Sequence, residues 1–282
     1  MKIFIGMIAY NEELIIEASL RSVYDCVDKI IIINGGPHGP STDNTVKIAK
    51  SIGPKVKIVD GTFRDTKKYM FKKFQRQAYI DEMEKDENNW CILHDADELY
   101  GRKDIERLVE YLRNADPKAM LFSPRLINFY RDFQHRRTCR PCRPVGVFRL
   151  TKGIRQGLHN EVYVNKTLLN KAKVLVHINL GDVVFYHYGL TVSFKKAVEK
   201  RKDYFSQNHY QGKHTRVMRR VEGDRVIKVL AADGSLQRYR TDEWERHYKE
   251  FWLPLWNLGT DWRKVVPYNG PHPEMEKLIK RE

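Results

Sequence analysis

The strongest constraint on the fold is a repeated order of short apolar runs and amphipathic segments in residues 1–122. Apolar runs typical of buried strands lie at 3–8, 30–33, 56–59, 90–93 and 120–122. Helical patterns lie between them, at 12–23, from an N-cap at Asp43, at 67–87 and at 105–112. Strands joined in this way by helices form a mainly parallel sheet with both faces covered. We therefore predict an α/β fold with its ligand site outside the carboxyl ends of the strands.

Polar motifs follow three of these predicted strands. They are Tyr10-Asn11-Glu12, Asn34-Gly35-Gly36 and Asp95-Ala96-Asp97. Two carboxylates one residue apart, at the end of a buried strand, are costly to place together unless a cation neutralises them. Mg²⁺ or Mn²⁺ prefers carboxylate and phosphate oxygens, so it would bridge this motif and a diphosphate. The alternative is an acidic cluster that interacts with a helix dipole.

Positive charge is concentrated in residues 123–173. The chain has 51 Lys and Arg against 36 Asp and Glu, and this stretch contains only Asp132 and Glu161 as acids. Its basic residues are Arg125, Arg131, Arg136, Arg137, Arg140, Arg143, Arg149, Lys152, Arg155, Lys166, Lys171 and Lys173. Such a stretch favours an anionic partner: a nucleotide diphosphate, a phosphorylated lipid carrier, an anionic membrane or a nucleic acid. A solvated basic surface that aids solubility is the alternative.

The four cysteines do not indicate a secreted disulfide framework. Cys26 and Cys91 stand alone in apolar surroundings, whereas Cys139 and Cys142 have the spacing of zinc ligands. A structural zinc needs four ligands, and His135 would supply only a third, so plain thiols are favoured. The chain has no run of 18 apolar residues and opens directly on a strand pattern. We expect a cytoplasmic protein, held at most on the inner face of the membrane.

After residue 122 the regular alternation fades, and the chain is expected to form three parts. Residues 1–122 would bind a donor substrate through its diphosphate. Residues 123–192 would complete the catalytic domain on the side of the acceptor substrate, and 193–282 would be a helical extension. Short β-like runs at 145–150, 161–164 and 174–178 and a hairpin at 225–240, turning at Asp233-Gly234, are also expected. The tail holds four tryptophans, Trp244, Trp252, Trp256 and Trp262. We favour docking of the tail on the core over an acceptor platform.

Four segments carry a resemblance to a known family. They are Ile8-Ala9-Tyr10-Asn11-Glu12-Glu13, Ser41-Thr42-Asp43-Asn44-Thr45, Arg76-Gln77 and His94-Asp95-Ala96-Asp97-Glu98. With them the chain resembles the glycosyltransferases of family 2, over roughly its first hundred residues. The resemblance implies the GT-A fold, a Rossmann-like, mainly parallel sheet flanked by helices. It also implies a nucleotide-sugar donor and a Mn²⁺ or Mg²⁺ cofactor.

The resemblance also assigns roles to residues of the donor side. Tyr10 and Glu12 would line the nucleoside pocket, Arg76 would approach the donor, Asp95 would lie near the ribose and Asp97 would bind the metal. The complete donor-binding set expected is Ala9, Tyr10, Asn11, Glu12, Asn34, Asp43, Asp60, Arg76, Asp95 and Ala96.

The chain departs from the family after the second strand. Asn34-Gly35-Gly36 replaces the usual acidic residue, which leaves the nucleotide open between UDP, GDP and dTDP. Asp60 is a candidate for the base edge, and a turn former at a strand end explains it equally well.

On the acceptor side, Gly157-Leu158-His159-Asn160-Glu161 resembles the family's acceptor segment. Glu161 is the candidate base that removes the proton of the acceptor hydroxyl, unless it only pairs with a nearby arginine. Phe185-Tyr186-His187-Tyr188-Gly189, followed by Lys195, Lys196 and Lys200, resembles the closing element, in which His187 would complete the metal shell. The alternative for His187 is a hydrogen-bonded core histidine.

The expected function is therefore a metal-dependent, inverting, hexosyltransferase-like glycosyl transfer in cell-envelope or glycan biosynthesis. The acceptor would be a glycan, a lipid-linked molecule or a phosphorylated molecule. A sugar nucleotidyltransferase would carry a Gly-rich basic loop after the first strand, where this chain has Ala9-Tyr10-Asn11-Glu12. A nucleic-acid-binding protein would explain the basic stretch with Phe129, Tyr130 and Phe133, but not the carboxylate pair, so we expect no nucleic-acid partner.

Overall fold

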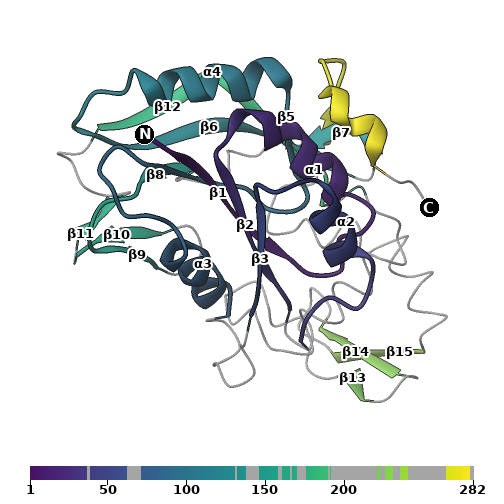
Figure 1. Ribbon diagram of the computed structural model, residues 1–282. Coiled ribbons are helices and arrows are strands. Elements are labelled where there is room, and N and C mark those ends of the chain that lie inside the picture. Colours follow the sequence, from purple (N-terminus) through teal and green to yellow (C-terminus); the bar gives the residue numbers. More distant parts are fainter. Residues whose placement is uncertain are drawn as a thin grey trace.

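A 10-stranded sheet with helices on both faces forms the centre of the molecule (Figure 1). The computed structural model describes residues 1–36, 39–61, 71–130, 132–137, 146–157, 161–165, 167–169, 176–189, 191, 221–222, 226–230, 236–240 and 265–279. The sheet order is β16-β7-β6-β8-β4-β1-β2-β3, and β12 pairs with β5 and β6. The α/β fold predicted from the sequence is confirmed.

The first half of the chain follows the predicted order of strands and helices. Its elements are β1 (Ile3–Ala9), α1 (Ile16–Val23), β2 (Lys29–Asn34), α2 (Thr45–Ser51), β3 (Val56–Asp60), α3 (Phe71–Asp81), β4 (Trp90–Leu93), β5 (Glu98–Tyr100) and α4 (Arg102–Arg113). β1 lies between β2 and β4, and β2 pairs with β3, all in parallel. The carboxyl ends of these strands therefore meet at one edge of the sheet.

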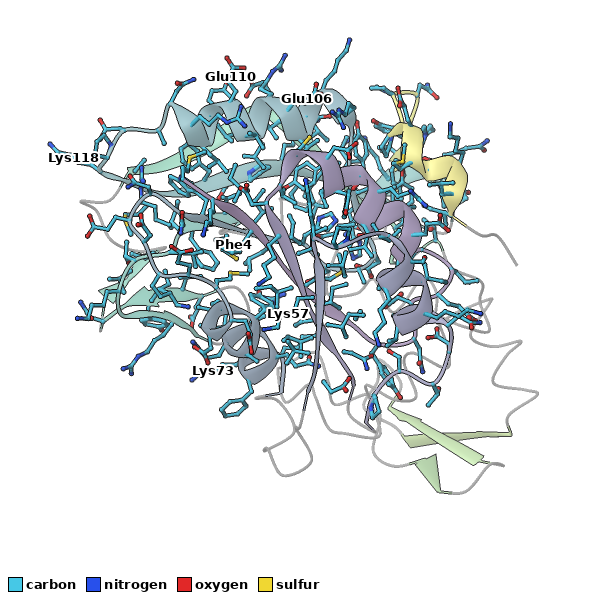
Figure 2. The ribbon with its side chains drawn as sticks, viewed as in Figure 1. Phe4, Lys57, Lys73, Glu106, Glu110 and Lys118 are labelled. Atoms are coloured by element: carbon cyan, nitrogen blue, oxygen red, sulfur yellow. The ribbon has the colours of Figure 1, made fainter. Side chains whose placement is uncertain are left out.

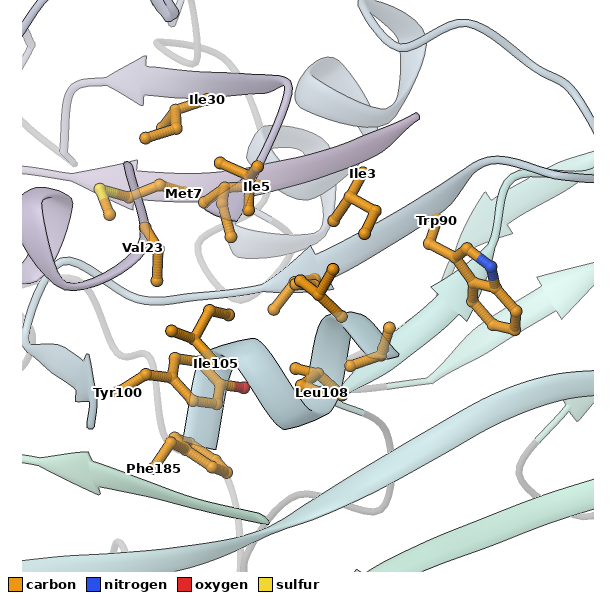
Figure 3. Close-up of a cluster of buried hydrophobic side chains, with 14 of the residues drawn as sticks. Ile3, Ile5, Met7, Val23, Ile30, Trp90, Tyr100, Ile105, Leu108 and Phe185 are labelled. Atoms are coloured by element: carbon orange, nitrogen blue, oxygen red, sulfur yellow. The ribbon is translucent and has the colours of Figure 1, made fainter. Parts of the chain in front are cut away.

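Both faces of the central strands are buried, which explains their continuous apolar sequence. Side chains alternate along β1, so Ile3, Ile5 and Met7 pack toward α1 and α4 (Figure 3). Phe4, between them, packs on the other face with Tyr79 of α3. Figure 2 shows Phe4 in the interior, whereas Glu106 and Glu110 lie on the charged outer side of α4, in solvent. The helices are amphipathic because each covers one face of the sheet.

Two 12-residue strands extend the sheet well beyond the predicted apolar runs. β6 (Ala119–Tyr130) and β12 (Val176–His187) pair in parallel, with a register shift between Leu180 and Val184. The sequence predicted only 120–122 and 174–178, because the rest of each strand mixes polar and apolar residues. β6 crosses the boundary expected at residue 122, so residues on both sides of that boundary belong to one sheet.

Shorter antiparallel strands complete this half of the molecule. β7 (Asp132–Arg137) and β8 (Val147–Arg149) pair with β6. β9 (Ile154–Gln156), β10 (Val162–Val164) and β11 (Thr167–Leu168) form a separate sheet of three strands. This small sheet packs on the α3 side, where Ile154 and Val162 join the core cluster of Phe4.

The described part of the expected helical extension is formed by strands and a 3-10 helix. It comprises β13 (Val221–Glu222), β14 (Val226–Leu230), β15 (Leu236–Arg240), β16 (Val265–Pro267) and η5 (Glu274–Leu278). At 265–267 the structure has a strand in place of the expected α-helix, because β16 pairs with β7, which is far away in sequence. β14 and β15 pair as the expected hairpin, but its turn, the segment after 193 and the four tryptophans lie outside the described residues.

Two further expectations concern cysteines and the membrane. Cys139 and Cys142 lie outside the described residues, and His135 bonds Asp132 at 2.9 Å. Cys26 and Cys91 are free thiols. None of the helices that the structure describes is long and apolar enough to cross a bilayer.

Arg149 is buried and holds the sheet together, which corrects its assignment to an anion-binding surface. It donates to the carbonyl oxygens of Glu87 (2.6 Å), Ala119 (2.7 Å) and Asp116 (3.0 Å). Its guanidinium carbon also lies 4.3 Å from the ring centroid of Trp90. Two of these carbonyls belong to the loops before β4 and β6 and the third to the first residue of β6, and a planar cation with several donors can satisfy all of them.

Replacing Arg149 with methionine should therefore lower the free energy of unfolding by about 3 kcal/mol, because three carbonyl partners and a cation–π contact are lost. Urea unfolding followed by circular dichroism measures the change. Arg155→Met is the matched control: Arg155 is exposed on β9, and its removal should leave stability nearly unchanged. Equal stability of the two variants would contradict the structural role.

Candidate active site

The Asp95-Ala96-Asp97 motif forms a tight turn between β4 and β5. The backbone N–H of Asp95 donates to Oε2 of Glu98 (2.9 Å), and the N–H of Glu98 donates to the carbonyl of Asp95 (3.0 Å). Ala96 is buried, so the turn is anchored in the core between its two carboxylates. The conformation of the motif is thus fixed by Glu98, whose side chain is 1% exposed.

Arg76 of α3 lies against the first carboxylate of the motif. Its Nη2 is 3.5 Å from Oδ1 of Asp95, and its side chain is only 5% exposed. The preceding residue, Gln75, is also buried and donates to the carbonyl of Gly35. α3 therefore joins the ends of β2 and β4, and the guanidinium offsets one of the two neighbouring negative charges.

His187 lies against the second carboxylate. Its Nε2 is 3.5 Å from Oδ1 of Asp97, and both side chains are mostly buried. β12 brings the histidine there by pairing with β5, opposite Glu98. The N–H of the next residue, Tyr188, donates to the carbonyl of Asp97 (2.8 Å). The end of β12, far away in sequence, is thereby attached to the Asp97 turn.

The tautomer of His187 follows from its second hydrogen bond. Nδ1 is 3.1 Å from Oδ1 of Asn128 on β6, and a carbonyl oxygen only accepts. Nδ1 therefore carries a proton, so in the neutral imidazole Nε2, on the side of Asp97, is the nitrogen whose lone pair would bind a metal ion. Such an oriented imidazole is typical of metal-binding histidines.

The Asp97–His187 pair fits a hard divalent cation. Two octahedral ligands of Mg²⁺ lie about 3 Å apart when they occupy neighbouring positions, close to the separation of this pair. In the residues that the structure describes, no group of three His, Cys, Asp or Glu surrounds a common point. The arrangement suits an ion that takes its remaining ligands from water and substrate phosphates, rather than one held in an all-protein cage.

The motif after β1 is held by the 41–45 segment. Asn11 has a positive φ of 54°, and its N–H donates to Oγ of Ser41 (3.1 Å) while its Oδ1 accepts from the N–H of Thr42 (2.9 Å). The N–H of Glu12 donates to Oγ1 of Thr45 (2.7 Å). These bonds fix the backbone from which Tyr10 and Glu12 project.

Asp43 belongs to this scaffold. Its Oδ2 accepts from the N–H of Glu13 (3.1 Å) and its Oδ1 from the N–H of Thr45 (2.9 Å), at the start of α2. The N-cap position itself is Asn44, one residue later than predicted. Since both carboxylate oxygens bond to backbone, direct contact between Asp43 and a donor stays a prediction.

Asn34 and Asp60 form a pair at the ends of β2 and β3. Nδ2 of Asn34 donates to Oδ1 of Asp60 (2.9 Å), and Oδ1 of Asn34 accepts from the N–H of Ser41 (3.1 Å). An aspartate at position 34 would face the Asp60 carboxylate and could not donate to it. The hydrogen bond to Asp60 therefore explains why the residue at position 34 is an asparagine. Ala9, opposite Asn34 in the register, is buried, and the Tyr10 ring packs against Gly36.

Glu161 begins the segment that leads into β10. Its Oε2 accepts from the hydroxyl of Tyr163 (3.2 Å), and its carbonyl accepts from Nε2 of Gln156 (2.9 Å). The N–H of Gln156 in turn donates to Gln77 of α3 (2.9 Å), next to Arg76. The small sheet is therefore attached to the helix that lines the site. Residues 158–160 are outside the described residues, so the base role of Glu161 stays a prediction.

The order of these motifs agrees with a family comparison. The protein-family model described as Glycosyl transferase family 2 matches residues 4–183 of the sequence, which is more than half of the chain. The chain belongs to glycosyl transferase family 2. The match includes the Asp95–Asp97 turn, the Arg76 helix and most of β12. No curated protein sequence matches the chain.

Three solved structures are similar to this family 2 glycosyltransferase. Glucosyl-3-phosphoglycerate synthase from Mycobacterium tuberculosis, in complex with Mn²⁺, uridine-diphosphate and glucosyl-3-phosphoglycerate, is 14% identical with a TM-score of 0.42, covering 85% of this chain and 86% of that chain. The same enzyme in complex with Mn²⁺, UDP-glucose and phosphoglyceric acid is 22% identical with a TM-score of 0.34, and the comparison covers 46% of this chain and 44% of that chain. S. aureus TarS 1-349 is 12% identical with a TM-score of 0.39, and the comparison covers 53% of this chain and 47% of that chain. In the last two comparisons the chain spans less than half of the compared chain.

Three residues that support the candidate site were not predicted from the sequence. Asn128 and Glu98 orient His187 and the Asp95 turn, and Tyr188 binds the Asp97 carbonyl. The sequence signal for Asn128 was a polar residue inside the run 126–130, but that run was not recognised as a strand. Glu98 follows the acidic motif directly and could have been interpreted as its turn partner.

Gly189 gives a test of this geometry. A Cβ at this position would lie 2.2 Å from Oδ2 of Asp97 and 2.9 Å from Nε2 of His187. Gly189→Ala should therefore displace one of these groups and weaken Mn²⁺ binding roughly 10-fold, the smallest effect usual for disturbed ligand orientation. Isothermal titration with Mn²⁺ measures it.

Gly181→Ala is the matched control, because a Cβ at Gly181 meets nothing within 4 Å. It should bind Mn²⁺ as the unmodified chain does. Unchanged Mn²⁺ affinity in Gly189→Ala would show that Asp97 and His187 do not form the metal site.

Proposed function

We propose that the chain transfers a sugar from a nucleotide-diphosphate donor to an acceptor hydroxyl, with a divalent metal and with inversion. The observation that carries the proposal is the pairing of Asp97 with an oriented His187, 3.5 Å apart, beside the Asp95–Arg76 pair. These groups stand at the carboxyl edge of a parallel sheet, where ligands of α/β folds bind. Membership of glycosyl transferase family 2 supports the same reaction.

Donor binding would use the backbone-anchored groups around the ends of β1, β2 and β4. Tyr10 and Glu12 stand on a turn whose backbone is held by the 41–45 segment, and we propose that they contact the nucleoside from this fixed position. Asp60 would meet the base edge and Asp95 the ribose. Preformed hydrogen-bonded groups of this kind bind a ligand without a further cost of ordering.

Stabilisation of the leaving group would depend on Asp97 and His187. A Mn²⁺ or Mg²⁺ ion held by these residues would supply Lewis-acid stabilisation of the nucleotide diphosphate. Arg76 keeps Asp95 paired, so that the two carboxylates of the motif have different partners. Asn128 accepts from Nδ1 of His187 and so orients Nε2 toward Asp97, where the neutral imidazole would bind the metal.

Transfer with inversion needs a base on the acceptor side. Glu161 is proposed to accept the proton of the acceptor hydroxyl as that oxygen attacks the anomeric carbon. The Tyr163 hydroxyl, which donates to Oε2 of Glu161, would hold the carboxylate in one rotamer. Acceptors proposed are a glycan, a lipid-linked molecule or a phosphorylated molecule. A peripheral membrane location at an anionic surface is proposed with them.

Asp97→Asn should abolish turnover and Mn²⁺-dependent binding of UDP or GDP while the melting temperature of the metal-free chain stays near that of the unmodified protein. The amide keeps the shape but removes the charge that a hard cation needs. A screen of UDP-, GDP- and dTDP-sugars with Mn²⁺, reading sugar release, measures turnover and identifies the donor. Asp25→Asn, an exposed carboxylate, is the control.

Full turnover in Asp97→Asn would contradict the metal role. Salt-sensitive retention of RNA or DNA, with no thermal stabilisation by any Mn²⁺–nucleotide diphosphate, would instead favour a nucleic-acid-binding protein.

Glu161→Gln should lower turnover 10²–10⁴-fold, roughly the contribution of a general base, and leave the dissociation constant of the donor unchanged. Single-turnover kinetics with saturating donor measure the rate. Tyr163→Phe, which keeps the carboxylate and removes only its hydrogen-bond donor, should retain most of the activity. An undiminished rate in Glu161→Gln would exclude Glu161 as the base.

A further inference from the structure

The segment 265–279, here called the C-terminal brace, pairs with the central sheet at β7 and packs beside α1. It lies outside the part matched by the family, residues 4–183. β16 pairs antiparallel with β7, and the N–H of Tyr268 donates to the carbonyl of Gln134 (2.6 Å). η5 then lies beside α1, as Figure 1 shows in yellow.

Aromatic rings attach the brace to the sheet. Phe129 of β6 lies at the centre, with ring-centroid distances of 4.8 Å to Tyr188 and 5.0 Å to both Tyr268 and His272. Phe133 of β7 meets the other side of Tyr188 at 5.1 Å. Phe129 and Tyr188 are fully buried, and four residues of the brace pack against their apolar cluster: Tyr268, Met275, Leu278 and Ile279.

A series of polar side chains in contact with one another runs through this cluster. The hydroxyl of Tyr188 donates to Oε2 of Glu276 (2.7 Å), and Nδ1 of His272 lies in contact with the same carboxylate oxygen. The Glu276 side chain is only 15% exposed. A carboxylate in such surroundings is stable when its partners are fixed, and it then holds those partners strongly.

Tyr188 connects these polar side chains to the Asp97–His187 pair. Its side chain bonds to Glu276, while its own N–H donates to the carbonyl of Asp97 (2.8 Å). Its neighbours in sequence are His187 and Gly189, the residue that packs directly against Asp97. Movement of the Tyr188 ring would therefore move the backbone that sets the separation of Asp97 and His187.

We propose that the C-terminal brace positions the metal-binding pair: Glu276 and His272 hold the hydroxyl of Tyr188, and the backbone of Tyr188 holds Asp97 beside His187. Tyr188, Glu276 and His272 are positioning residues, since they act through the pair. This inference rests on the proposed function of Asp97 and His187. It means that the family-matched segment alone lacks part of its own metal site.

The test is the affinity of the full-length chain for Mn²⁺, measured by the electron paramagnetic resonance signal of the free ion, at a temperature where circular dichroism shows every variant folded. Tyr188→Phe removes one hydroxyl and keeps the ring, so the aromatic cluster persists. It should weaken Mn²⁺ binding roughly 10-fold, as loss of a group that orients a metal ligand does.

The matched control is Tyr111→Phe, because the Tyr111 hydroxyl also donates to a carboxylate, Oδ2 of Asp182, at 2.8 Å. That bond lies at the surface between α4 and β12, and its loss should leave the affinity for Mn²⁺ unchanged.

A second pair of variants separates positioning from general stability. Glu276→Gln keeps an oxygen that accepts from Tyr188, whereas Glu276→Ala removes it. Glu276→Gln should therefore retain most of the Mn²⁺ affinity, and Glu276→Ala should lose as much as Tyr188→Phe. A role in stability alone would lower the melting temperature of both and leave the Mn²⁺ affinity of the folded chains unchanged, which would overturn the proposal.

Asp97→Asn distinguishes failure of this inference from failure of the proposed function. If Asp97→Asn loses Mn²⁺ binding while folded Tyr188→Phe and Glu276→Ala retain it, only the role of the brace is refuted. If Asp97→Asn binds Mn²⁺ normally, the proposed metal site is refuted and the inference with it.

Discussion

The arrangement of the site depends on one electrostatic constraint: two carboxylates stand within one turn at the end of a buried strand. Their mutual repulsion is acceptable only when each has a positive or metal-bound partner. Asp95 meets Arg76 from α3, and Asp97 lies beside His187 from β12, where a divalent cation held by both side chains would offset its charge. The sheet, α3 and the last strand of the family-matched region are all needed to satisfy this constraint.

The long parallel pair of β6 and β12 connects the two sides of the molecule. β6 supplies Asn128, which orients His187, and Phe129, which receives the C-terminal brace on a neighbouring position of the same strand. Successive side chains point to opposite faces of a strand, so Asn128 and Phe129 serve the site and the aromatic cluster separately. A change in the register of β6 would disturb both, because the face that each residue occupies would be exchanged.

Sequence reasoning was reliable where the structure is local. The central strands are buried on both faces, so their apolar runs are unbroken and their ends are marked by polar motifs. It was less reliable for β6 and β12, whose outer parts mix polar and apolar residues, and for the described part of the C-terminal region, which forms strands and a 3-10 helix. It also assigned Arg149 to a basic surface, although three backbone carbonyls and Trp90 bury it.

The sequence by itself determined the α/β order, the carboxylate pair at a strand end and the family resemblance, because these depend on residue type and on spacing within short segments. Only the tertiary structure decided which partners the carboxylates meet and why position 34 is an amide: Asn34 faces Asp60 across two strands. It also decided that Tyr188 joins Asp97 to Glu276. Such contacts join residues far apart in sequence, and they form only after strand pairing has fixed which elements are neighbours.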